Sequence, residues 1–194
     1  MNYGELKTNI KALAFEENET IDEYIENDVI PTAINRAISS IGERIFPIVK
    51  TYEIEQDGTD TEDMEYDFTS IVSDFLAFEK HPVRIDDGDV YEPFNDYIIK
   101  NDEIIRIPGS VVGTFEVYYR AEHTPYTADG EMDDVQIPLK RRVHYLVPML
   151  AAYYVWLDDD PTKAAQYYNM YETEEAGILA EKSRPRMRFV KGGI

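Results

Sequence analysis

The spacing of apolar residues changes near residue 48 and changes back near residue 137, and this constrains the fold more than any other feature. Towards the N-terminus, apolar residues recur every three or four positions, the period of an amphipathic helix: Tyr3, Leu6, Ile10, Leu13 and Ala14, then Ile34, Ala37, Ile38, Ile41 and Ile45. In the middle of the chain the period falls to two, as in a half-buried strand: Tyr52, Ile54, Met64, Tyr66 and Phe68. The sequence therefore predicts an α+β fold.

The predicted domains follow these two changes. Residues 1–47 and 137–183 are expected to form one discontinuous domain, a bundle of N- and C-terminal helices. Residues 48–122 are expected to form an inserted small antiparallel β-sandwich or barrel, joined to the next helix by a polar loop at 123–136. Residues 184–194 are expected to be an extended C-terminal tail.

Capping and proline signals predict where the N-terminal helices begin and end. Thr20 and Glu23 have capping-box spacing, which predicts the start of the second helix. Pro31 is expected to break or kink that helix, because proline lacks a backbone donor and crowds the preceding turn.

Similar signals apply to the C-terminal helices. Pro138 suits the first turn of a helix. Pro148 lies within the apolar run 143–157 and predicts a kink there, with the carbonyl of His144 left free. The last helix is predicted from Pro161 to about Lys182.

Turn residues divide the middle block into short strands. Asp57 and Gly58 mark a turn, and Lys100, Asn101 and Asp102 are typical of a hairpin turn. Strands are predicted from 48, at 64–68, and near 83–86, 97–100, 103–107 and 113–120.

Charge and composition narrow the classes of function. The net charge of −20 argues against a basic face for nucleic acid and against docking on anionic membranes. An acidic channel wall would instead let DNA pass without binding it. The chain has no cysteine, which excludes disulfides, cysteine-bound zinc and a thiol nucleophile. Without an apolar run of membrane-spanning length or a signal-peptide core, we expect a soluble protein made inside the cell.

Charge is unevenly distributed along the chain. Residues 182–194 contain five basic residues and no acidic one, whereas the rest has 14 basic and 39 acidic residues, a net charge of about −25. Basic and apolar residues alternate in the tail, at Arg184, Arg186, Arg188, Phe189 and Val190. This composition suits contact with an acidic neighbour, by strand addition or otherwise; disorder at a chain end is the alternative.

Three acidic stretches are candidates for metal chemistry, and each has a structural interpretation. Asp160 before Pro161 is typical of a helix N-cap followed by proline, which makes 158–160 a joint between two helices. The stretch 84–92 lacks the spacing of a calcium loop and is better explained by a turn. Asp133 and Asp134 fit a solvated loop.

Catalytic motifs are absent from the sequence. His81, His123 and His144 are far apart and stand in no metal-ligand pattern, and neither a nucleophile elbow nor a glycine-rich phosphate loop occurs. No cofactor and no metal are expected. The fifteen tyrosines suit core edges and subunit interfaces alike.

The order of elements resembles head–tail adaptor (connector) proteins of tailed bacteriophages. The resemblance is carried by helices beginning at "YGEL", a β insertion ending in a "YYR" stretch, the segment "DDVQIPLKRRVHYLVPMLAAYYVWL", and "DDDPTKAAQYYNMYE". It covers nearly the whole chain. The β insertion is larger than in the all-helical members of that family.

This resemblance implies a non-enzymatic protein of the virion neck, made in the host cytoplasm. It implies a homo-oligomeric ring of about twelve copies beneath the portal protein, which extends the DNA channel and docks a stopper, tail or tail-completion protein. DNA would pass through without specific binding, and no membrane is involved. It also implies that the C-terminal tail, through Arg184, Arg186, Arg188 and Phe189, contacts the portal.

Two other functions are also compatible with the sequence. A tail-completion or tail-terminator protein would form a sixfold ring around a β core. A metal-dependent hydrolase would use the carboxylates of 158–160 or of 86–89.

Overall fold

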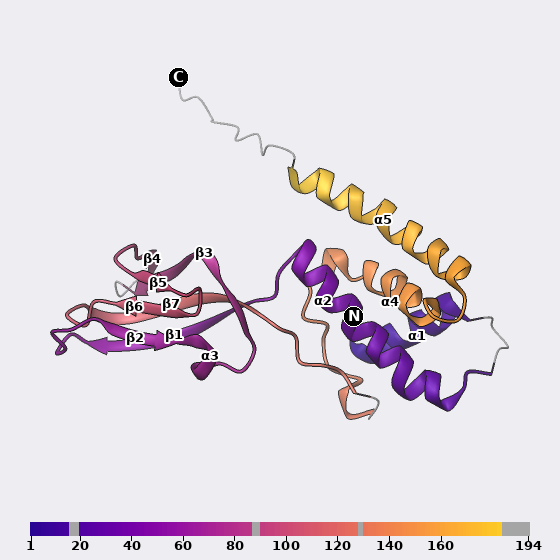
Figure 1. Cartoon of the computed structure of the whole chain (residues 1–194), viewed down its shortest axis with the longest axis horizontal. Coiled ribbons are helices and arrows are strands. Elements are labelled where there is room, and N and C mark those ends of the chain that lie inside the picture. The colour runs from indigo at the N-terminus through magenta and orange to yellow at the C-terminus, as the bar shows by residue number, and fades with distance from the viewer. Residues whose placement is uncertain (16–19, 87–89, 128–129, 184–194) are drawn as a thin grey trace, which may run out of the picture. The chain divides into compact units, whose positions relative to one another are not determined.

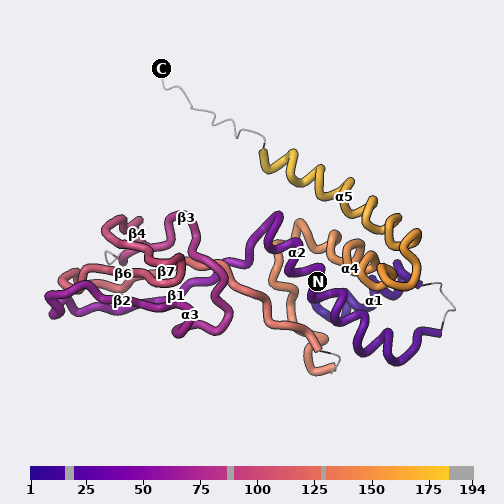
Figure 2. The backbone as a smooth tube through the Cα atoms, in the orientation of Figure 1, coloured from indigo at the N-terminus to yellow at the C-terminus, as the bar shows by residue number. Residues whose placement is uncertain are grey.

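The computed structural model describes residues 1–15, 20–86, 90–127 and 130–183. The chain has mixed helix and antiparallel sheet and divides into two compact units. The helical unit comprises Met1–Ile41 and the chain from Tyr126 onward, and the strand unit comprises Gly42–Pro125. The chain passes into the strand unit in the last turns of α2 and returns after β7 (Figure 1; Figure 2).

The described residues of the helical unit form four α-helices: α1 (Tyr3–Ala14), most of α2 (Ile30–Arg44), α4 (Leu146–Trp156) and α5 (Pro161–Ser183). A π-helical turn, η1 (Ile25–Val29), precedes α2, and two short 3₁₀ turns, η2 (Gly130–Met132) and η3 (Arg141–Val143), precede α4. The predictions of a helix over the first fourteen residues and of one beginning at Pro161 are confirmed.

Helix α4 is the centre of this unit. It is apolar on almost every side, and most of its residues are buried, as expected for a helix enclosed by others. Tyr154 contacts Ser40 of α2 through a 3.1 Å hydrogen bond. Tyr153 packs its ring on that of Tyr168 in α5, with 5.0 Å between centroids. Towards α1, Trp156 packs against Phe15.

The second helical segment begins later than the sequence predicts. Asp22 caps it, because its Oδ1 accepts from the backbone N of Tyr24 at 2.7 Å; the predicted start at Thr20 was wrong. The helix also continues through Pro31 into α2. The irregularity lies just before the proline, in η1, where the backbone N–H of Ile30 donates to Ile25 five residues back. A π turn of this kind accommodates a residue that cannot donate.

The predictions for Pro138 and Pro148 were wrong, whereas the one for Pro161 is confirmed. Pro138 lies in a bend, and regular helix starts only at Leu146. Pro148 therefore falls in the first turn of α4, where a missing N–H costs little, and no kink inside a longer helix arises. The carbonyl of His144 is not free, because it accepts from the backbone N of Val147 at 3.3 Å.

Outside 87–89, the strands of the strand unit form two antiparallel sheets. One has the order β1-β7-β3-β4, formed by β1 (Val49–Asp57), β7 (Val112–Ala121), β3 (Phe75–Asp86) and β4 (Tyr91–Pro93). The other has the order β2-β6-β5, formed by β2 (Met64–Asp67), β6 (Ile104–Ile107) and β5 (Ile98–Lys100). A short helix, α3 (Phe68–Ile71), follows β2.

One apolar core is shared by both sheets of this unit. Phe68 is fully buried and meets four aromatic rings, those of Tyr52, Phe75, Phe78 and Tyr119. The other buried members come from strands of the two sheets: Ile54, Val83, Ile105, Ile107, Phe115, Val117 and Ala121.

Several strand boundaries differ from the predictions. The predicted strand near 83–86 is the end of a twelve-residue strand that starts at Phe75. Its register against β7 shifts between Phe78 and Val83, and Pro82 lies within that interval, where proline is tolerated because pairing is interrupted. Phe68 belongs to α3 instead of a strand. The hairpin turn is confirmed, with positive φ at Asn101 and Asp102.

Within the described ranges, no helix combines the length and the apolarity that crossing a bilayer requires.

Candidate interaction surface

The acidic joint lies between α4 and α5. Asp160 Oδ1 accepts from the backbone N–H groups of Thr162 and Lys163, at 3.1 and 3.0 Å. This is the geometry of an N-cap, and Pro161 occupies the first helical position. Asp158 and Asp159 are exposed. In the described part of the chain, no three His, Asp or Glu side chains converge as metal ligands would.

Trp156 is held at the end of α4 by contacts on several sides. Its Nε1 donates to the carbonyl oxygen of Ala14 at 3.1 Å, and the Lys163 ammonium lies 3.6 Å from its ring centroid. The Phe15 ring lies 5.4 Å away, centroid to centroid. These contacts fix an aromatic side chain next to the acidic joint.

Two adjoining hollows open beside this tryptophan, between the start of the second helical segment and the end of α4. The larger, about 470 Å³, is lined by Phe15, Asp22, Tyr24, Ile25, Val29, Val155, Trp156 and Asp159. The smaller, about 210 Å³, is lined by Tyr24, Asp28, Val29, Thr32, Ala33, Arg36, Tyr154 and Asp158. Because they share Tyr24 and Val29, we treat them together as the α2–α4 groove.

The groove has an apolar floor and an acidic rim. Its four aspartates (Asp22, Asp28, Asp158 and Asp159) are exposed, and none of them forms an ion pair with another described residue. Its lining includes one basic residue, Arg36, whose guanidinium lies 4.3 Å from the ring centroid of Tyr154. A groove of this kind can bind a positively charged segment that carries an apolar side chain.

Sequence patterns single out residues on only one wall of this groove. Asp158 and Asp159 were singled out as part of the joint, whereas Asp22, Tyr24 and Asp28 carried no signal. More than a hundred residues separate the two walls in the sequence, and only the packing of the helices brings them together.

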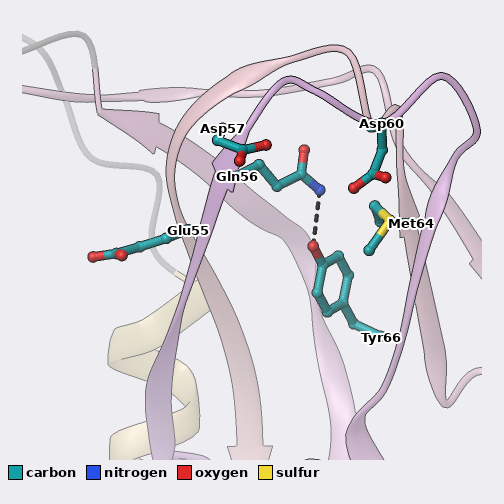
Figure 3. A pocket seen from close by; sticks show the side chains of 7 residues that line it. Glu55, Gln56, Asp57, Asp60, Met64 and Tyr66 are labelled. Atoms are coloured by element: carbon teal, nitrogen blue, oxygen red, sulfur yellow. Dashed lines mark hydrogen bonds between the residues drawn. The ribbon is translucent and has the colours of Figure 1, made fainter.

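A different hollow, of about 410 Å³, lies in the strand unit at the end of β1 (Figure 3). The Gln56 amide lies 2.9 Å from the Tyr66 hydroxyl at its centre. Asp57 accepts from the hydroxyl and backbone N of Thr59, and this hydroxyl hydrogen bond lowers the pKa of the Asp57 carboxyl. Asp57 therefore hydrogen-bonds within its own turn, and we interpret the hollow as a space between neighbouring loops.

The three histidines lie in different surroundings. His81 is exposed in β3, and His123 is buried after β7. His144 belongs to the helical unit, where its Nε2 lies 2.8 Å from the carbonyl oxygen of Leu139.

Two of the stretches considered in the sequence lie outside the described residues, wholly or in part. The tail residues Arg184, Arg186, Arg188, Phe189 and Val190 fall in 184–194. The centre of the stretch 84–92, at 87–89, also falls outside; β3 ends before it and β4 begins after it.

Comparison with known proteins gives the family. The model of the family described as SU10 adaptor protein matches residues 1–190, nearly the whole chain. A search of curated proteins gave no match. The match spans both units and includes the joint and most of the tail. The chain belongs to the SU10 adaptor protein family, a family of phage head–tail adaptors.

Proposed function

We propose that this protein is a structural head–tail adaptor that forms a ring of about twelve copies beneath the portal of a tailed phage. The ring extends the DNA channel and presents the docking surface for a stopper, tail or tail-completion protein. The observation that carries this proposal is the family match over residues 1–190. Membership of this family implies a structural role in the virion, in contact with other phage head and tail proteins.

The negative charge of the chain supports the proposal that the ring lines the channel through which DNA passes. A net charge of −20 repels DNA phosphates, so DNA in contact with an acidic channel wall stays mobile. Carboxylates that stay exposed in the structure, such as those of Glu53, Glu55 and Glu172, keep this charge at the surface.

We assign the two parts of the chain different roles. The helical domain, 1–47 with 137–183, is proposed to be a bundle that forms the body of the ring. The β insertion, 48–122, is proposed to be a sandwich that projects outward or towards the tail, with 123–136 as its connection. The apolar core shared by both sheets supports the sandwich arrangement.

The C-terminal tail is proposed to make contact with the portal or with a neighbouring copy, through Arg184, Arg186, Arg188, Phe189 and Val190. Asp160 and Pro161 have a structural role as the start of α5, supported by the cap hydrogen bonds. The protein is proposed to have no enzymatic activity and no cofactor.

Quantitative mass spectrometry of purified particles tests this function. About twelve copies per particle, counted against the major capsid protein, are expected for a ring component. Absence of the chain from particles would contradict the proposal. Electron microscopy of the neck adds the ring symmetry: twelvefold supports the adaptor, whereas sixfold would assign the chain to tail completion or termination. Binding of Mg²⁺ or Mn²⁺ to the chain, measured by calorimetry, would support the alternative function of a metal-dependent hydrolase.

A further inference from the structure

The α2–α4 groove has the chemistry of a site for a basic, aromatic peptide. Tyr24 is 66% exposed at its edge, and Trp156 and Val155 form part of its apolar lining. Its four aspartates have no ion-pair partner among the described residues, although their charges lie close around one hollow. Such charges are stabilised when an opposite charge approaches them.

The chain itself contains a segment of matching chemistry. Residues 182–194 carry five basic residues and no acidic one, and Phe189 and Val190 stand among them. A phenylalanine side chain fits a hollow of about 470 Å³ with room to spare. The remaining 181 residues have a large acidic excess, so the charge of the tail is opposite to that of the rest of the chain.

Chain length excludes the tail of the same copy. The groove lies at the start of α5 and the tail begins at its end, and the helix has 23 residues. Its ends are therefore about 33 Å apart, at ~1.5 Å of rise per residue. Phe189 is six residues beyond Ser183, and a fully extended chain covers at most about 22 Å over that length. Phe189 cannot reach its own groove.

We propose that the α2–α4 groove binds the C-terminal tail of a second copy of this chain, with Phe189 on the apolar floor and Arg186 and Arg188 towards the aspartates. The contact is head-to-tail, because one copy contributes the groove and the other the tail. Contacts of this type close into rings when the rotation between copies allows it. The inference rests on the proposed function and identifies one of the contacts that would hold the ring together.

A peptide-binding experiment on the full-length chain tests the inference. The acceptor is the full chain with Arg186→Glu, Arg188→Glu and Phe189→Ala, so that its own tail does not compete. The probe is a synthetic peptide with the sequence of residues 183–194. Trp156 is the only tryptophan of the chain and lines the groove, so its fluorescence reports binding directly. We expect a saturable change in Trp156 emission that weakens as salt is added.

Matched variants locate the binding. Asp158→Asn with Asp159→Asn in the acceptor should weaken binding about fivefold, as expected for two exposed charge pairs. Asp60→Asn with Asp96→Asn makes the same charge change in the strand unit and should leave binding unchanged. A peptide with Phe189→Ala should bind at least about tenfold more weakly, because its apolar anchor is lost.

Two outcomes would overturn the inference: no binding of the peptide to the chain, or equal weakening of binding by both pairs of aspartate substitutions. Sedimentation of the unmodified chain gives an independent test, since self-association should be lost with Phe189→Ala. If the peptide does not bind but particles contain about twelve copies of the chain, the tail–groove contact is rejected and the proposed adaptor function is retained. Absence from particles would reject the adaptor, whatever the peptide does.

Discussion

The indole Nε1 of Trp156 donates a 3.1 Å hydrogen bond to the carbonyl oxygen of Ala14, the last residue of α1. Beside it, the hydroxyl of Tyr167 donates to the carbonyl of Leu13 at 2.9 Å. The last carbonyls of a helix have no partner within the helix. Here α4 and α5 supply those partners from aromatic side chains, so the end of α1 is tied to the joint that borders the groove.

Removing the Tyr167 hydroxyl should therefore weaken the helical unit. Tyr167→Phe keeps the ring and loses one hydrogen bond, at an expected cost of about 1 kcal/mol in the free energy of unfolding. Tyr168→Phe is the matched control, because the described contacts of Tyr168 are made by its ring. Urea unfolding followed by Trp156 fluorescence measures both. Equal losses in the two variants would show that the hydroxyl of Tyr167 contributes nothing specific.

Two substitutions of Asp160 should separate the contribution of its cap hydrogen bonds from the contribution of its negative charge. Asp160→Ala removes both cap hydrogen bonds and should cost about 1 kcal/mol. Asp160→Asn keeps an accepting oxygen and should cost much less, since asparagine is an equally good N-cap. The same urea titration distinguishes them. If asparagine proved as costly as alanine, charge on the helix dipole would be the main contribution of Asp160.

Two glycines should respond to alanine in opposite directions. A Cβ on Gly109 would lie 2.2 Å from the backbone oxygen of Glu62 and 2.8 Å from Cβ of Asp60. The turn after β6 would have to move, so Gly109→Ala should destabilise the strand unit by about 1–3 kcal/mol. Gly177 in α5 has open space around it, and Gly177→Ala should stabilise the helical unit by about 0.5–1 kcal/mol.

Differential scanning calorimetry of both glycine variants gives the test, with Trp156 fluorescence identifying the transition of the helical unit. A neutral Gly109→Ala would show that the turn relaxes without strain. A destabilising Gly177→Ala would show that this face of α5 is covered in solution.

Tyr119 predicts a specific alkaline behaviour. Burial, followed by the charge and hydrogen bond of Asp74, raises the pKa of Tyr119 to about 12, whereas an unfolded tyrosine ionises near ~10. The stability that this tyrosine contributes is complete below pH ~10 and is lost as the pH rises towards 12, because only the unfolded state then releases the proton. The cost of Tyr119→Phe should accordingly shrink between these pH values.

The melting temperature of the strand unit at several alkaline pH values measures this effect. Tyr52→Phe is the control, because Tyr52 is 36% exposed and its ring contact with Phe68 survives the change. A cost of Tyr119→Phe that stays constant up to pH 12 would contradict the raised pKa.

Local signals predicted those elements whose form depends on near neighbours in the sequence. The first helix is an example, because its apolar residues recur at helical spacing and most of them are buried on one face. The hairpin at Asn101 is another, since its turn needs residues that tolerate positive φ. The effect of a proline depends on its position in an element, which is why the kink predicted at Pro148 is absent: this residue lies in the first turn of α4.

The sequence alone determined the alternation of helix and strand, the acidic charge with its basic tail, and the resemblance to an adaptor, because these follow from residue order and composition. Only the tertiary structure decided that Asp22 and Tyr24 face Trp156 and Asp159 across a groove, and that Asp28 faces Asp158 in the adjoining hollow. It also decided that Trp156 and Tyr167 close the end of α1. Both depend on how helices distant in sequence pack, and packing energy is shared among many contacts, none of which has a signature of its own in the sequence.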